Sequence, residues 1–345
     1  MLRYFAWAHG LTALGLVGAF WLGFAYSGTL SGAMGFLTIG AILAVLEISL
    51  SFDNAIVNAN KLNEMDPVWR RRFLTWGILI AVFGMRLVFP LLIVVVAAGL
   101  GPVEAIRLAA TQPAQYAEII RGAHLSIAAF GGAFLMMVAL SYFIDEGKEV
   151  DWIAGLEAVL RRCGSVRGAE IALVLVFMIG FSWVLPETSR DEFLFAAVSG
   201  LLTFLGVDML GRVLDAQDAA ATAAKGGLGA FLYLEVLDAS FSFDGVIGAF
   251  ALTQNLFLIG IGLGIGALYV RSMTIMLVEQ QTLTEFRYLE HGAFWSILVL
   301  SVIMFAQTLT HIPEVITGLL GAGFIACSLV SSLRYRARKA RLRTE

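Results

Sequence analysis

Apolar stretches recur along the whole chain and are separated by short segments rich in charged residues. A helix that crosses a lipid bilayer needs about 20 consecutive apolar residues, and most of these stretches reach that length. The pattern predicts ten spans, at residues 5–26, 33–59, 74–100, 123–144, 169–186, 193–211, 228–252, 256–278, 292–310 and 314–333. The first stretch lacks a small-residue cleavage site, so we expect a membrane span there and not a signal peptide.

Composition agrees with this pattern. Hydrophobic residues make up 59% of the 345 residues and charged residues only 14%, whereas soluble domains carry about 25% charged residues. We therefore expect an all-α polytopic membrane protein surrounded by a lipid bilayer. The chain has no phosphate-binding glycine loop, no nucleophile elbow and no cysteine cluster, so we expect neither an enzyme nor a nucleic-acid-binding protein.

The basic residues divide the loops into two groups. Lys and Arg gather at the N-terminus, in loops 60–73, 145–168, 212–227 and 279–291, and in the tail. The alternate loops hold only Arg107, Arg121 and Arg190. Loops rich in Lys and Arg stay in the cytoplasm. The distribution therefore predicts cytoplasmic N- and C-termini, in what we expect to be a bacterial inner membrane, with the basic tail touching anionic lipid.

Two segments of the chain read as copies of each other. Residues 43–56 (LAVLEISLSFDNAI) and 234–247 (LEVLDASFSFDGVI) are identical at eight of fourteen positions. Each half would hold five spans, an odd number, so the second half must enter the membrane from the opposite side. We expect two inverted-topology five-helix repeats, at residues 1–190 and 191–333, followed by a basic cytoplasmic tail at 334–345.

Other segments predict surface helices and close packing. The segments near 102–121 and 146–167 are too polar to cross a membrane, and we expect amphipathic helices that cover the ends of spans. Gly260, Gly262, Gly264 and Gly266 allow close helix approach, which we expect within the second repeat.

The two copied segments place acidic residues at matching positions. Asp53 aligns with Asp244, and Glu47 aligns with Asp238. Each carboxylate costs roughly 2.5–3.5 kcal/mol near the membrane midplane, so such residues usually serve a cation or proton site. Glu47 and Asp53 would lie roughly 120° apart on an unbroken helix. A local helix break at each motif would bring the carboxylates to one ion, and the sequence leaves open whether the two spans break there.

The residues around these acids would make a shell of oxygen atoms. We expect Asp53, Asp244, Glu47, Asp238 and Asn54 to hold a metal ion, with Ser51 and Ser242 in support. Oxygen shells suit Mn²⁺, Ca²⁺ and Mg²⁺.

Three further charged residues leave alternatives open. Arg86 and Arg271, each in the third span of its half, are expected to be structural counter-charges, and the acids could then form ion pairs without a transport role. Glu235 could accept a proton or be a polar group near the entrance of its span.

The motifs EISLSFDN and DASFSFDGVIGAFALTQN resemble the TerC superfamily of integral membrane proteins, named for tellurite resistance. Within it the chain looks like the branch known only as a domain of unknown function. The resemblance implies cation efflux, with Mn²⁺ as the leading ion, and site residues at Glu47, Asp53, Asn54, Asp238, Asp244 and Gly245. TerC-like proteins usually have Ser where Gly245 stands, which removes one possible hydroxyl ligand.

The sequence therefore predicts a transporter that exports a divalent metal cation through a midplane carboxylate site, and proton exchange could drive the export. Two alternatives remain at this stage. One is a non-transport membrane scaffold in tellurite or metal stress resistance, with the basic tail as a docking surface. The other is a proton-coupled exporter of a small organic solute, which would need a roomy central cavity.

Overall fold

A computed structural model describes residues 2–77, 80–145, 147–148, 150–219, 227–310 and 312–341. Its helices are α1 (Leu2–Ser27), α2 (Leu30–Leu50), α3 (Phe52–Glu64), α4 (Pro67–Arg72), α5 (Phe89–Ala98), α6 (Pro102–Thr111), α7 (Pro113–Gly122), α8 (His124–Phe143), α9 (Ala154–Cys163), α10 (Ala169–Ser182), α11 (Glu187–Ala219), α12 (Leu228–Leu252), α13 (Leu256–Glu279), α14 (Thr282–Glu285), α15 (Leu289–Gln307) and α16 (Glu314–Arg341). Two π-helical segments, η1 (Phe73–Gly77) and η2 (Ile80–Val88), precede α5. The described residues contain no strand, which confirms the all-α prediction.

Among the residues that the structure describes, seven helices are long and apolar enough to cross a membrane, as expected for an integral membrane protein. They lie in α1, α2, α8, α11, α13, α15 and α16. The other three predicted spans also contain helices, but over its described residues none of these helices by itself is long and apolar enough to cross a membrane by the same criterion. Helix α10 is short, α12 carries several acids, and the third predicted span is π-helical before α5. The segment from Arg86 to Ala98 pairs with α6 across a 107° bend.

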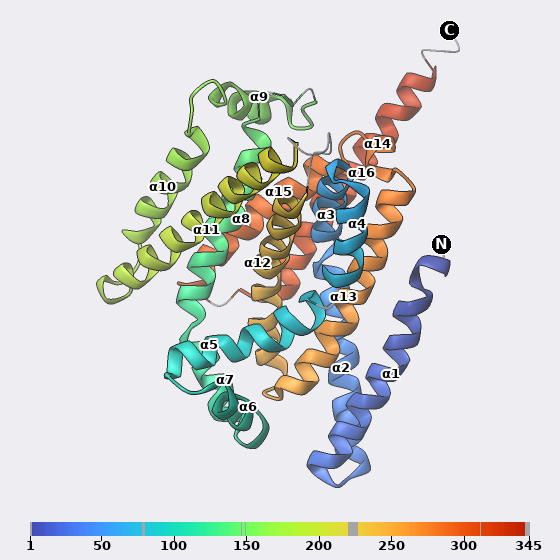
Figure 1. Cartoon of the computed structure of the whole chain (residues 1–345), viewed down its shortest axis with the longest axis vertical. Coiled ribbons are helices and arrows are strands. Elements are labelled where there is room, and N and C mark those ends of the chain that lie inside the picture. The colour runs from blue at the N-terminus through green and yellow to red at the C-terminus, as the bar shows by residue number, and fades with distance from the viewer. Residues whose placement is uncertain are drawn as a thin grey trace.

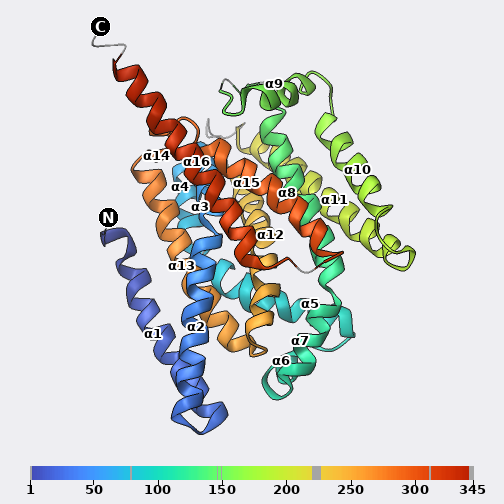
Figure 2. The ribbon, with the colours of Figure 1, turned by 180° about the vertical axis from the view of Figure 1, so that it is seen from behind.

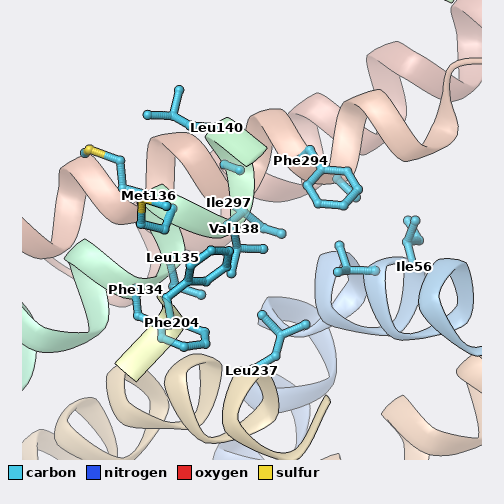
Figure 3. Packing of buried hydrophobic residues seen from close by; sticks show 14 of the residues in the cluster. Ile56, Phe134, Leu135, Met136, Val138, Leu140, Phe204, Leu237, Phe294 and Ile297 are labelled. Carbon is cyan, nitrogen blue, oxygen red and sulfur yellow. The ribbon is translucent and has the colours of Figure 1, made fainter. Parts of the chain in front are cut away.

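The largest core joins helices that are far apart in the sequence (Figure 1). Figure 3 shows Phe134 of α8 close to Phe204 of α11, with Ile297 of α15 and Leu237 of α12 nearby and Ile56 of α3 further to one side of the same cluster. Helices α3 and α12 carry parts of the two acidic motifs and α15 packs against α3, so the core holds the backbone of both motifs.

The short helices lie at the two ends of the molecule (Figures 1 and 2). Helices α4, α9 and α14 gather at one end with the C-terminal end of α16, whereas α6, α7 and the turn between α1 and α2 lie at the other. The segments predicted as surface helices thus hold α6, α7 and α9. The predicted tail continues α16 as a helix to Arg341, and Arg336 Nη1 lies 2.5 Å from Glu285 Oε1.

Helix α9 is attached to the core by a buried carboxylate. Glu157 is 0% exposed and accepts hydrogen bonds from Lys148 Nζ at 2.6 Å, His291 Nδ1 at 2.8 Å and Trp295 Nε1 at 2.8 Å. Burial opposes the charge of this carboxylate, but these hydrogen bonds outweigh desolvation and hold the pKa of Glu157 well below its usual range. The cluster joins α9 to α15, so α9 is more than a loose cover over helix ends.

The glycines of α13 pack across the two halves of the chain and not within the second half, which corrects the sequence-based expectation. A Cβ atom at Gly266 would lie 2.4 Å from Cβ of Glu47 on α2, and one at Gly262 would lie 2.5 Å from Cβ of Leu43. Both contacts are closer than real side chains allow, so only glycine lets α13 approach α2 here. This approach places α13 directly beside the first acidic motif.

A helix break is present at the first acidic motif only. Ser51, with φ −102° and ψ 21°, separates α2 from α3. Its N–H still bonds to Glu47 O at 3.1 Å, so the chain bends without unwinding. Helix α12 continues from Leu228 to Leu252 through Asp244 and Gly245, so the helix does not break at the second motif. Packing against α3 and α13 favours the continuous helix over the weak helix propensity of Asp-Gly.

Candidate functional site

Glu47 and Arg86 form a buried ion pair. Arg86 Nη2 donates to Glu47 Oε1 at 2.5 Å, and Arg86 Nε donates to the main-chain oxygen of Leu263 at 3.1 Å. Both side chains are almost inaccessible to solvent. The sequence-based expectation of a counter-charge is therefore met for Glu47. The pair connects α2 with η2 and reaches α13.

Asp53 lies just past the bend, in the first turn of α3. Its Oδ1 accepts the main-chain N–H of Asn54 at 2.8 Å, and its Oδ2 accepts the hydroxyl of Ser296 on α15 at 2.8 Å. The side chain is 5% exposed, and no cationic side chain pairs with it among the described residues. Asp53 is thus a buried carboxylate held by neutral donors at a helix N-terminus, where the helix dipole favours negative charge.

Asp238 joins the second motif to the first. Asn54 Nδ2 donates to Asp238 Oδ1 at 2.7 Å, and Asn58 Nδ2 donates to the same oxygen at 3.3 Å. The two asparagines lie one turn apart on α3, so both reach one carboxylate on α12. The duplicated segments are therefore in direct contact, although 184 residues separate Asn54 from Asp238.

Two small cavities flank this junction. The first, the carboxylate cavity, has a volume of about 40 Å³ and is lined by residues from five helices: Glu47, Ser51, Asp53, Gly245, Ser296 and Thr317, with Leu50, Phe241, Leu300, Gly318 and Gly321. Glu47 and Asp53, which point apart on an ideal helix, both line it because of the bend at Ser51. A water molecule needs only about 10–15 Å³, so the carboxylate cavity has room for a guest the size of a few water molecules.

The second, the arginine cavity, has a volume of about 30 Å³. It is lined by Asn54, Asn58, Arg86, Asp238, Arg271 and Thr274, with Phe73, Leu74, Gly77, Ala267 and Val270. Arg271 donates from both Nε and Nη2 to the main-chain oxygen of Leu74, with Nε at 2.9 Å. Arg271 therefore caps a carbonyl of the π-helical segment η1 and does not pair with an acid there.

Several buried oxygen atoms near the cavities accept no hydrogen bond from described residues. They are the Oδ1 atoms of Asn54 and Asn58, Oε1 of Glu235, and the hydroxyl oxygens of Ser242 and Thr317. An unsatisfied buried acceptor costs about 1–3 kcal/mol. Oxygens of this kind are available to a guest with positive charge or N–H and O–H donors.

The structure brings the predicted site residues together in part. Glu47, Ser51 and Asp53 share the carboxylate cavity, whereas Asn54 and Asp238 line the arginine cavity. The side chain of Asp244 lies outside the described residues, although the backbone places it beside Gly245. Within the described part of the chain, no three His, Cys, Asp or Glu side chains cluster as metal ligands.

Sequence reasoning missed Ser296 and Thr317. Ser296 donates to Asp53, and Thr317 is 8% exposed with its hydroxyl at the carboxylate cavity. Both are single hydroxyl residues in apolar helices, α15 and α16. Such hydroxyls commonly bond to the carbonyl one turn back, so their position in the sequence alone does not mark them as site residues.

Gly245 leaves room for the carboxylate of Glu47, and this leads to a prediction. A Cβ at Gly245 would lie 2.9 Å from Glu47 Oε2. The other carboxylate oxygen of Glu47, Oε1, is bound to Arg86. We expect Gly245→Ala to displace this carboxylate and to lower the free energy of unfolding by about 1–3 kcal/mol, the usual cost of overpacking. Thermal and denaturant unfolding in detergent measure this change in the free energy of unfolding.

The matched control is Gly206→Ala in α11, where an added Cβ meets no atom within 4 Å. That substitution should leave stability unchanged or raise it, because alanine is a better helix former than glycine. Equal stabilities of the two variants would show that Gly245 does not make space for Glu47.

Comparison with known proteins gives a family but no relative of established function. No curated protein and no solved structure matches the chain. One family model, described as "Protein of unknown function (DUF475)", matches residues 52–339. This range contains Asp53, Asn54, Arg86, Asp238 and Ser296, and so most of the geometry above. Because the match covers most of the sequence, the chain belongs to the DUF475 family of proteins.

Proposed function

We propose that this protein is a membrane transporter that exports a divalent metal cation, with Mn²⁺ as the leading candidate and proton exchange as the driving process. The central observation in support is the carboxylate cavity, in which Glu47 and Asp53 meet hydroxyl groups and α12 of the second motif. The metal is the substrate, held by Asp53, Glu47 and the Thr317 hydroxyl. The proposed site also includes Asp244, next to Gly245, and Asp238 and Asn54 at the adjoining arginine cavity.

The size of the cavities favours an ion over an organic solute. Volumes of about 40 and 30 Å³ correspond to a few water molecules. An amino acid would need far more room, so the solute-exporter alternative has less support. Oxygen ligands match the preference of Mn²⁺, Ca²⁺ and Mg²⁺, and a partly dehydrated ion would fit.

The purely structural alternative explains Glu47 better than Asp53. The ion pair with Arg86 accounts for one buried charge, because each partner neutralises the other. Asp53 has only the Ser296 hydroxyl and a main-chain N–H as partners among the described residues. A negative charge that is buried without a counter-charge is expensive, and a transported cation would provide the missing partner.

The proposed topology is ten spans in two inverted repeats, at residues 1–190 and 191–333, in a bacterial inner membrane. In this arrangement the end of the molecule with α4, α9, α14 and the basic end of α16 faces the cytoplasm. The basic loops at that end support this orientation. The relationship to TerC-type metal exporters also remains part of the proposal.

Flux measurements test the function directly. Proteoliposomes that contain the purified protein should take up Mn²⁺ well above empty liposomes, and a pH gradient should accelerate the uptake. Parallel runs with Ca²⁺, Mg²⁺ and Zn²⁺ would rank the ions. If no ion is transported above background, and deletion of residues 334–345 alone removes the cellular phenotype, the scaffold alternative is favoured.

A further inference from the structure

A buried carboxylate on α12 is not accounted for by the two cavities. Glu235 is 7% exposed, and its Oε1 has no hydrogen-bond partner among the described residues. This oxygen lies against η1, where a Cβ at Gly77 would be 2.7 Å away. Glu235 is therefore buried within the protein and not exposed at the entrance of its span.

The surroundings of Glu235 do not compensate a negative charge. Asp238 lies three residues further along α12, on the same face of the helix, and like charges at this spacing repel. The arginine cavity is lined by Arg86 and Arg271. Arg86 is bound to Glu47, and Arg271 is bound to the main-chain oxygen of Leu74. The facing segment η1, FLTWG, has no charged residue. An unpaired buried carboxylate is costly as an anion, so Glu235 is held as the neutral acid when no cation is bound.

Along α12, Glu235 lies between a residue of a vestibule and a residue of the arginine cavity. Two residues before it, Tyr233 lines a vestibule of about 590 Å³ that also contains Lys61, Glu64, Glu170, Asp208 and Arg212. Three residues after it, Asp238 lines the arginine cavity. Glu235 itself does not line the vestibule; its carboxylate lies on the face of α12 that meets η1, on the same side as Asp238.

We propose that Glu235 is the proton-binding residue that couples cation transport to proton movement in the opposite direction. This inference rests on the proposed function. When a cation enters the acidic motifs, its positive charge stabilises the Glu235 carboxylate, and the carboxyl O–H bond gives up its proton to water. When the cation leaves from the other side, the carboxylate takes up one proton again. One proton is thus exchanged at this residue for each cation.

The experiment compares two modes of transport in the same proteoliposomes. Net Mn²⁺ transport driven by a pH gradient needs the proton step, whereas exchange of Mn²⁺ inside for Mn²⁺ outside does not. We expect Glu235→Gln to lower gradient-driven transport at least 10-fold and to keep Mn²⁺–Mn²⁺ exchange within about 2-fold of wild type. The control is Glu118→Gln, an exposed acid on α7, which should leave both modes unchanged.

An infrared measurement provides a readout that does not depend on transport. Addition of Mn²⁺ to wild-type protein should remove the carbonyl stretching band of a protonated carboxylic acid, and Glu235→Gln should lack this change. If gradient-driven transport and the infrared change both persist in Glu235→Gln, the role of Glu235 is overturned, but the proposed transport function is not. Absence of Mn²⁺ exchange in the wild type would overturn the proposed function, and with it this inference.

Discussion

Replacement of Asp53 by asparagine should reduce Mn²⁺ flux in proteoliposomes by about 100-fold or more, because even residues that only support metal ligands contribute 10–100-fold. The substitution preserves the shape of the side chain and its contact with the Ser296 hydroxyl. It removes only the negative charge that a cation would neutralise. Because Asp53 is buried without a cationic partner among the described residues, the variant should be at least as stable as wild type.

The combination of lost flux and retained stability is the informative result. Thermal unfolding and size-exclusion chromatography establish folding, and isothermal titration measures Mn²⁺ binding. The matched control is Asp66→Asn. Asp66 caps the N-terminus of α4 through a hydrogen bond with Val68 N–H at 2.8 Å, and asparagine caps equally well. That control should keep wild-type flux. Wild-type flux and binding in Asp53→Asn would contradict the proposed site.

Replacement of Glu157 by alanine should lower the free energy of unfolding by about 3–5 kcal/mol, the typical cost of breaking a buried ion pair. The variant would leave Lys148, His291 and Trp295 as buried donors without their shared acceptor. The expected structural result is detachment of α9 from α15. Unfolding in detergent measures the stability, and proteolysis within residues 150–168 reports the detachment.

The control for Glu157 is an exposed ion pair that also joins distant segments. Glu285 and Arg336 lie 2.5 Å apart but are each 49% exposed, so Glu285→Ala should cost no more than about 1 kcal/mol. The pH dependence has a definite sign. Folding lowers the pKa of Glu157, so its stabilisation is complete above the pKa of the unfolded chain and is lost as the pH falls toward the folded value. A loss of similar size in both variants would contradict the role of the buried cluster.

The acidic junction could be predicted from sequence because carboxylates in apolar stretches are rare and expensive. Their duplication implied contact between the halves, and the hydrogen bond from Asn54 to Asp238 agrees with it. The partners of these acids could not be predicted in the same way. Hydroxyl residues are frequent in apolar helices, and only the packing of α15 against α3 shows that Ser296 is the one that reaches Asp53.

Other differences have their origin in tertiary packing. Motif geometry suggests a break such as the bend at Ser51, whereas the unbroken path of α12 depends on neighbours that local propensity does not include. Glu157 appeared in the sequence as one charge among many on an amphipathic segment. Its burial depends on Trp295 and His291, which lie more than a hundred residues further along the chain. The π-helical geometry before α5 had no signal in the hydrophobic pattern.

The two oxygens of Glu47 have different neighbours. One is bound by Arg86, which lines the arginine cavity, and the other lies close to Gly245 at the carboxylate cavity. A single carboxyl group cannot strengthen both contacts at once. Binding of a guest at the oxygen near Gly245 and binding of the Arg86 guanidinium at the other oxygen are therefore thermodynamically linked, and the linkage is reciprocal. Under the proposed function, Arg86 would be an internal competitor of the transported cation for the negative charge of Glu47.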